Sequence, residues 1–362
     1  MFIAAIVKHR VWLVATVFFF ALGIWGVVLS LQTRHVFEES FRARVSAAFL
    51  STKVFSNEVI AKDEKEISLL FVGDVMLSRA VGRRIEKEQD SNYPFLKIVD
   101  TLRAADIAFG NLEGPISARG ENQGSEYSFR ADPQVVHGLK FAGFDVMSVA
   151  NNHILDWGGE ALADTVDILN TNGIRSLGAG KNNKDANAPY VFTMGDNRIV
   201  FFGFTTLYPK SLEAGDDSAG ISSFNLLRVK SEITEIKKSN LDTIVIVSFH
   251  WGDEYEMKAN EKQREIAHAL IDAGVDLIVG HHPHVIQEVE RYSPSTNSGS
   301  SSRTSWIAYS LGNFIFDQNF SQETQEGLML KVGVRHGKIS SVREDKISIS
   351  PSFQASLVED FE

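Results

Sequence analysis

Cysteine is absent from the 362 residues of the sequence. Its absence excludes disulfide bonds, zinc sites built on thiolates and cysteine nucleophiles. Any bound metal ion must therefore be held by histidine, aspartate, glutamate or asparagine side chains. The sequence also lacks an internal repeat, a nucleotide-binding glycine loop and a Gly-x-Ser-x-Gly nucleophile motif.

Positive charge is scarce as well. Lys and Arg number 36 against 46 Asp and Glu, which gives a formal net charge of −10. A general nucleic-acid binder needs a basic face, so the composition predicts no nucleic-acid partner. An anionic substrate is still compatible with this charge, because bound metal ions reverse the local field of an acidic protein.

One long uncharged segment, residues 11–33, lies near the N-terminus. Its length suffices to cross a hydrocarbon core of about 30 Å, so it predicts a single transmembrane anchor. Basic residues precede it, which favours a cytoplasmic segment 1–10 and a large extracytoplasmic domain at the cell membrane. The alternative is a cleaved signal peptide, whose apolar region is usually only about 7–15 residues long.

The rest of the chain divides into a stalk, a large domain and a short tail. Residues 34–66 mix charges with scattered apolar residues and are interpreted as a juxtamembrane stalk. From residue 67 to 350, short apolar strands alternate with amphipathic helices, which predicts an α/β domain. Residues 351–362 are interpreted as a C-terminal tail, and the Ser-rich stretch 294–305 as a flexible loop.

Metal-capable side chains follow the C-terminal ends of the apolar strands. A single residue of this kind usually belongs to a turn or caps a helix. Five such clusters occur here, each closing a predicted strand, at the edge where ligands bind in open α/β sheets. The clusters are Asp74, Asn111 to Glu113, Asn152 with His153, His250, and His282 with His284.

Six segments carry a family resemblance. They run from Phe71 to Met76, Gly110 to Glu113, Ala150 to Gly158, His250 to Tyr255, Gly280 to Val285 and Tyr309 to Asp317. In these segments, and in their order, the sequence resembles the CapA/PgsA family of poly-γ-glutamate capsule proteins, within the calcineurin-like metallophosphatase superfamily. The resemblance covers essentially all of residues 67–335.

The resemblance implies a four-layer αββα sandwich with a site for two divalent ions, Mn²⁺, Zn²⁺ or Fe. Two ions about 3.5–4 Å apart clamp a phosphoryl group and activate a bridging water. By motif, Asp74 and His284 would ligate the first ion, Glu113 would bridge both, and Asn152, His250 and His282 would complete the second.

His153 matches the catalytic histidine of the superfamily, and the resemblance implies that it protonates the leaving oxygen. Asp156 would orient His153 through a ring N–H, or alternatively cap the helix that follows. Two positions depart from the superfamily pattern. Met76 replaces a histidine ligand, and Glu113 replaces an aspartate. The sequence therefore does not decide between a catalytic and a non-catalytic metal site.

Four further residues are predicted to contact the substrate. Arg130 is a candidate anion contact, and Trp251 and Glu254 directly follow a predicted ligand and are expected to line the cleft. Asn313 follows a strand near the site, where a structural role in the turn is an equal alternative.

Two functions are compatible with these features. The first is a metal-dependent hydrolase that acts in synthesis or export of a capsule polymer, or on a phosphoester in other envelope material. The second is a non-catalytic component that binds the anionic polymer. The resemblance implies membrane-bound capsule synthase subunits as partners in either case.

Overall fold

The computed structural model describes residues 66–294 and 304–358. The predicted segments 1–10 and 11–33, and residues 34–65 of the predicted stalk, lie outside these ranges, as do residues 295–303 of the predicted loop. Within the described ranges, no helix has the length and apolar character needed to cross a bilayer.

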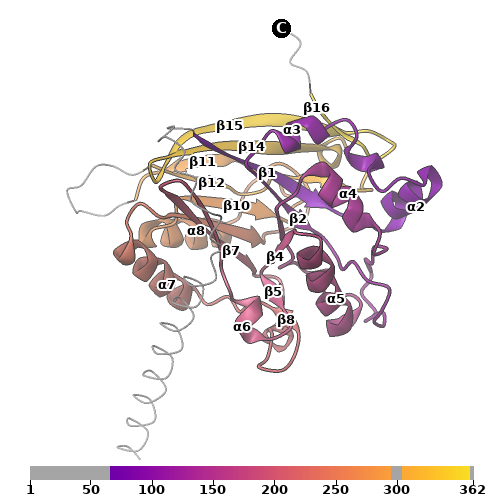
Figure 1. Ribbon diagram of the computed structural model, residues 1–362, viewed down its shortest axis with the longest axis horizontal. Coiled ribbons are helices and arrows are strands. Elements are labelled where there is room, and N and C mark those ends of the chain that lie inside the picture. Colours follow the sequence, from indigo (N-terminus) through magenta and orange to yellow (C-terminus); the bar gives the residue numbers. More distant parts are fainter. Residues whose placement is uncertain (1–65, 295–303, 359–362) are drawn as a thin grey trace, which may run out of the picture. The chain divides into compact units, whose positions relative to one another are not determined.

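The first sheet has eight strands (Figure 1). Its order is β16-β15-β14-β1-β2-β3-β4, with β13 also paired to β1. The strands are β1 Ile67–Val75, β2 Ile107–Leu112, β3 Val146–Ser148, β4 Arg175–Leu177, β13 Asn313–Ile315, β14 Glu326–Arg335, β15 Lys338–Ile349 and β16 Ala355–Leu357. Because β16 pairs with β15, the domain extends beyond the predicted boundary at residue 350.

The second sheet has six strands in the order β11-β12-β10-β9-β7-β6. They are β6 Tyr190–Met194, β7 Asn197–Thr205, β9 Ile244–His250, β10 Leu277–His281, β11 Val289–Tyr292 and β12 Ser305–Ala308. The four central strands are parallel, and the edge strands β6 and β11 are antiparallel. A small separate pair joins β5 (Ala179–Gly180) to β8 (Gly220–Ile221).

Helices cover the outer faces of both sheets. The chain forms α2 Arg79–Glu88, α3 Val99–Arg103, α4 Val135–Ala142, α5 Gly158–Thr171, α6 Asn183–Ala186, α7 Leu226–Ser239 and α8 Glu261–Ala273. Short 3₁₀ turns occur at Tyr93–Phe95, Lys210–Leu212 and Glu323–Gln325. Local sequence fixes the start of α8, because Asn260 and Gln263 form a reciprocal capping box.

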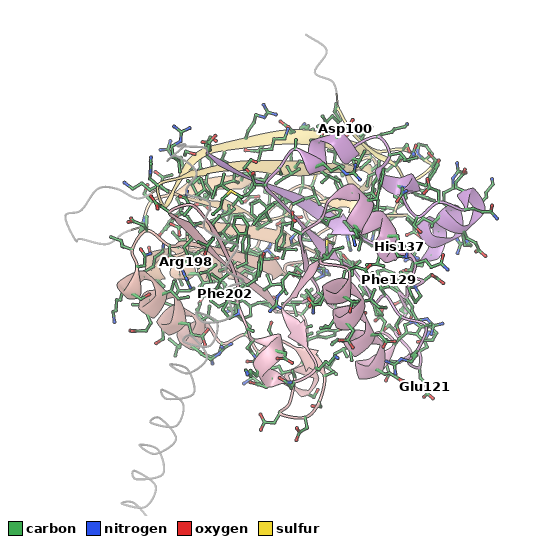
Figure 2. The ribbon with its side chains drawn as sticks, in the orientation of Figure 1. Asp100, Glu121, Phe129, His137, Arg198 and Phe202 are labelled. Atoms are coloured by element: carbon green, nitrogen blue, oxygen red, sulfur yellow. The ribbon has the colours of Figure 1, made fainter. Side chains whose placement is uncertain are left out.

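Three hydrophobic cores separate the layers. Side chains alternate between the two faces of a strand, so Leu69 and Phe71 of β1 face the second sheet while Leu70 and Val72 face α2 to α5. A third core packs the second sheet against α7 and α8. Figure 2 shows side chains filling the space between the two sheets. This arrangement confirms the predicted four-layer αββα architecture.

Candidate metal centre

The site lies where the C-terminal ends of four parallel strands meet. In the first sheet, Asp74 of β1 is in register with Asn111 of β2. In the second sheet, His250 of β9 is in register with His281 of β10. Register aligns the polar side chains within each sheet, and the packing of the two sheets brings the two pairs together.

The inner group consists of Asp74, Glu113 and His250, whose candidate ligand atoms lie within 4.8 Å of one another. All three residues are buried. The Asn111 amide lies among them: its Nδ2 donates to Asp74 Oδ1 at 2.8 Å and lies 3.3 Å from His250 Nδ1. His250 Nε2 lies 2.7 Å from Asn152 Oδ1, so the predicted ligand Asn152 reaches this group too.

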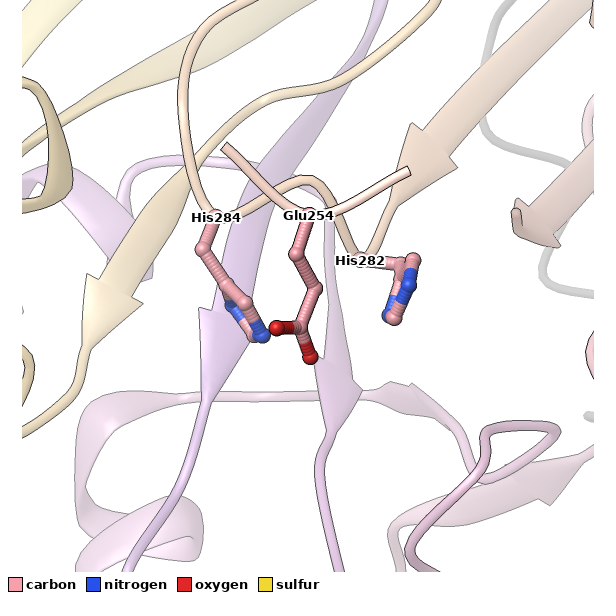
Figure 3. A group of neighbouring side chains, drawn as sticks. All are labelled: Glu254, His282 and His284. Carbon is pink, nitrogen blue, oxygen red and sulfur yellow. The ribbon is translucent and has the colours of Figure 1, made fainter. Parts of the chain in front are cut away.

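The outer group consists of Glu254, His282 and His284, whose ligand atoms again lie within 4.8 Å of one another (Figure 3). Both histidines are buried, whereas Glu254 is exposed. His284 Nδ1 lies 3.3 Å from Asp74 Oδ2, and the rings of His250 and His282 have centroids 4.9 Å apart. The two groups are therefore adjacent and form one site.

Glu113 lies between the two groups. Its Oε1 is 3.5 Å from His284 Nε2 and 3.9 Å from His153 Nε2, and this buried oxygen accepts no hydrogen bond. The buried Nδ1 of His282 also has no hydrogen-bond partner. Buried polar atoms are normally paired, so these two atoms fit residues that hold a cation. A carboxylate and imidazole donor set suits Mn²⁺, Zn²⁺ or Fe.

The pKa values of the buried groups diverge strongly. Burial disfavours the Asp74 carboxylate, yet the imidazoles of His281 and His284 hold its pKa well below the usual range. Burial raises the pKa of Glu113 well above its usual range, against the attraction of His284. Burial, followed by repulsion from His282, holds the pKa of His250 well below its ordinary value.

His284 differs from His250 in the direction of its pKa shift. Burial alone would lower its pKa, but Glu113 and Asp74 outweigh burial and raise the pKa to about 9. The raised pKa of His284 thus reflects the attraction of the two buried acidic side chains beside it. A divalent ion supplies positive charge equally well and leaves the imidazole neutral to act as a ligand.

His153 is held at the border of the inner group. Its Nδ1 lies 2.8 Å from Asp156 Oδ2, and its ring stacks on Phe129 with centroids 4.0 Å apart. Asp156 also accepts hydrogen bonds from the Phe129 backbone N–H and the Ser125 hydroxyl. Asp156 thus orients His153, and the helix α5 begins without a side-chain cap.

Two predicted substrate contacts need correction. The prediction for Trp251 is wrong, because this residue is 1% exposed, stacks on Phe249 and donates Nε1–H to the Tyr309 carbonyl. Asn313 is fully buried, and its Oδ1 lies 3.0 Å from His284 Nδ1. Asn313 therefore positions a histidine of the site and is not available to a substrate.

The other two predicted substrate contacts lie at the surface of the domain. The Arg130 guanidinium carbon lies 3.5 Å from the ring centroid of Trp157, close to Asp156 in sequence. Its role as an anion contact stays a prediction. Glu254 lies in the outer group, between two predicted ligands, and this position could not be recognised from its sequence neighbours alone.

Met76 packs in the hydrophobic core of the first sheet. Its side chain is fully buried in the core beneath the helices, and its sulfur accepts hydrogen bonds from the backbone N–H and the hydroxyl of Ser78. Sequence reasoning correctly identified this position as lacking a donor. It did not assign a role to Asn111, whose amide connects Asp74, Glu113 and His250. Its place directly after a strand was the available signal.

Solved structures similar to this chain include two proteins with low sequence identity. A novel phosphatase from Mycoplasma pneumoniae is 17% identical with a TM-score of 0.48, over 79% of this chain and 95% of that chain. The Haemophilus influenzae NAD nucleotidase is 11% identical with a TM-score of 0.47, over 82% of this chain and 60% of that chain.

Two curated relatives are similar over most of the described domain. Capsule biosynthesis protein CapA of Bacillus anthracis is 32% identical over 275 residues, which cover 74% of this chain and 64% of that protein. PGA biosynthesis protein CapA of Bacillus subtilis is 32% identical over 281 residues, covering 76% and 68% respectively.

The family model described as bacterial capsule synthesis protein PGA_cap matches residues 68–318. This range contains every residue of the inner and outer groups, together with Asn152, His153 and Asn313. The match covers more than half of the chain and agrees with the two Bacillus relatives. The chain therefore belongs to the bacterial capsule synthesis protein family PGA_cap, which includes the CapA proteins.

Proposed function

We propose that the chain is a membrane-anchored, extracytoplasmic CapA-type protein with a two-ion hydrolase site. It would act in the synthesis or export of poly-γ-glutamate or a similar anionic capsule polymer. The observation that carries the proposal is the buried convergence of Asp74, Glu113 and His250 beside His282 and His284. The names of the two Bacillus relatives support capsule biosynthesis, and that of the Bacillus subtilis relative supports the polymer. The uncharged segment 11–33 supports the anchor.

Six residues would hold the ions: Asp74, Glu113, Asn152, His250, His282 and His284. Bound divalent ions polarise an oxygen of the scissile group and supply hydroxide at neutral pH. Glu113 suits a bridging role, because its Oε1 is unpaired and faces His284 across 3.5 Å. The Asn111 amide donates a hydrogen bond to the Asp74 carboxylate, and this bond fixes the orientation of the carboxylate even when no metal ion is bound.

His153 is the proposed proton donor to the leaving group. Asp156 accepts a hydrogen bond from the Nδ1–H of His153, so Nε2 would be the atom that carries the transferred proton. Nε2 lies on the side of Glu113, 3.9 Å from Oε1, so the proton would be delivered next to the ions. Stacking on Phe129 covers one face of the ring and limits its rotation.

The test compares metal content and phosphodiester hydrolysis in the full-length chain, its His153→Ala variant and His137→Ala. His137 projects from α4 at the surface and serves as the matched control (Figure 2). We expect two bound ions in all three proteins. Turnover should fall by about 10²–10⁴-fold in His153→Ala alone, the usual contribution of a general acid. Absence of bound metal in the wild-type chain would refute the proposal.

The competing function is a non-catalytic component that binds the polymer in a capsule synthase complex. One observation favours it: the fully buried Met76 withholds a donor where catalytic superfamily members place a histidine. Complementation of a capsule-deficient strain separates the two functions. Capsule restored by His153→Ala but not by Asp74→Asn would support binding, and capsule restored by neither variant would support catalysis. If the chain were a phosphoesterase acting on other envelope material, even the wild-type chain would not restore the capsule.

A further inference from the structure

The loop after β9 places a carboxylate between two histidines of a different loop. Glu254 lies in this loop, and His282 and His284 follow β10 (Figure 3). In Figure 3 the carboxylate of Glu254 lies between the two imidazole rings. Their ligand atoms lie within 4.8 Å of one another, a separation that a single ion can span.

Backbone hydrogen bonds fix the position of this loop. The N–H of Trp251 donates to the His281 carbonyl at 3.1 Å, and the N–H of Tyr255 donates to the Pro283 carbonyl at 2.8 Å. One residue further on, Gln287 Nε2 donates to the Glu256 carbonyl at 2.7 Å. Glu254 is thus presented by a loop that is tied to the histidine segment on both sides.

Unfavourable backbone conformations accumulate in the same place. Tyr255, His282 and His284 all have positive φ angles, of 64°, 99° and 58°. Such conformations cost on the order of 1–3 kcal/mol each in non-glycine residues and tend to occur at functional sites. Here they turn the two loops so that their side chains converge.

The outer group also contains a buried nitrogen atom that is free to ligate a metal ion. His282 is 6% exposed, and its Nδ1 has no hydrogen-bond partner. His284 is positioned by Asn313, whose amide Nδ2 donates to Gln318 and to the Thr324 carbonyl. Two fixed imidazoles and a carboxylate form a donor set that binds catalytic zinc or iron and leaves coordination positions open.

We propose that Glu254 is a metal ligand that holds one divalent ion together with His282 and His284, while the inner group holds the other. The inference rests on the proposed two-ion site and adds a ligand that the family resemblance does not assign. Because Glu254 is exposed, the ion in the outer group would also be the one open to substrate.

The experiment measures Zn²⁺ and Mn²⁺ binding by calorimetry to the full-length, metal-stripped chain. Glu254→Gln keeps the side-chain shape but removes the charge, and Glu254→Asp keeps a carboxylate. Asp253→Asn and Glu256→Gln are the matched controls, since both residues are exposed acids beside Glu254. The absorption spectrum of the Co²⁺-loaded chain reports the coordination of the ion independently of activity.

Glu254→Gln should weaken one of two binding events by at least about 100-fold, because loss of residues that only orient ligands already costs about 10–100-fold. Its Co²⁺ spectrum should change. Glu254→Asp should recover part of the affinity, and the two controls should bind both ions as the wild type does. Two ions bound with unchanged affinity by Glu254→Gln would refute the inference and leave the proposed function standing. A wild-type chain that binds no ion would refute both.

Discussion

The inner and outer groups are built in different ways, although they lie side by side. Two members of the inner group, Asp74 and His250, are strand residues placed by β-sheet register, and Glu113 directly follows β2. The outer group lies on two loops held by backbone hydrogen bonds and positive φ angles. The inner group therefore depends on the core of the domain, whereas the outer group depends on a few local bonds.

This difference predicts how each group responds to change. Alterations of the inner group should affect folding and metal binding together, because its carboxylates are buried in the domain. Alterations of the outer loops should affect metal binding while the domain stays folded. Four measurements, described from the largest expected effect to the smallest, sharpen or break this comparison.

Asp74→Asn should have the largest effect. The carboxylate is fully buried and lies 3.3 Å from the protonated His284, so its loss leaves an imidazolium without its partner. Breaking a buried pair costs about 3–5 kcal/mol. Urea unfolding of the metal-free chain and its metal content measure both consequences. The exposed Asp253→Asn is the control, and a stable Asp74→Asn variant that still binds two ions would break the comparison.

The metal-free chain should lose stability as the pH rises from about 6.5 to about 9. The pKa of His284 is about 9 in the folded chain and about 6.5 when unfolded, so folding binds the proton more tightly. Its stabilising contribution is complete below pH 6.5 and is lost on passing pH 9, a change of about 3 kcal/mol. The raised pKa of Glu113 also makes the folded chain less stable as the pH rises, and this loss begins at a lower pH than that of His284.

Urea unfolding at several pH values measures this loss. His284→Gln should lack most of it, whereas His137→Gln should show the wild-type pH dependence. Saturation with Zn²⁺ should also remove it, because a metal-bound imidazole is neutral. A stability profile in His284→Gln identical to that of the wild type would show that another group carries the extra proton.

Asp156→Asn should reduce turnover by about 10–100-fold, the usual effect of losing a group that orients an active histidine. The carboxylate accepts from His153 Nδ1, and an amide can present the wrong atom to the ring. Metal content should not change, because Asp156 touches neither group. The rate constant and the metal content are measured on the same preparation, with the exposed Glu160→Gln as the control. Unchanged turnover would remove His153 from the proton-transfer step.

Gly252→Ala should have the smallest effect on stability and act on the outer group alone. Gly252 has φ +86°, and an added Cβ would lie 2.8 Å from the Gln263 side chain. The left-handed conformation costs about 1–2 kcal/mol for a residue with a Cβ. Thermal unfolding and Zn²⁺ affinity measure the effect. Gly195 also has a positive φ, of +58°, but nothing lies within 4 Å of an added Cβ, so only Gly252→Ala should weaken outer metal binding.

Much of the fold and the inner group could be predicted from the sequence. The alternation of short apolar runs with amphipathic segments from residue 67 onward predicted an α/β domain, and the structure forms one. The predicted ligands also followed strands. Because neighbouring parallel strands end at a common edge, His250 and His282 were expected near one another, whereas the packing of the two sheets brings Asp74 to them.

The roles of loop residues depended on tertiary contacts. Trp251 and Glu254 received the same predicted role, yet Trp251 lies in the core and Glu254 lies in the outer group. Side chains alternate between the faces of a strand, so the residue after His250 points away from the site. Glu254 returns to it because Tyr255 is hydrogen-bonded to Pro283, which is distant in sequence.

The sequence by itself determined the α/β alternation, the donor residues at the strand ends and the absence of sulfur ligands other than methionine. Tertiary structure alone decided which donors share a group, that Asn313 orients His284, and that Met76 faces the core. The physical reason is range. Strand periodicity and turn chemistry act over a few residues, whereas ligand geometry depends on bonds between segments that meet only after both sheets have packed.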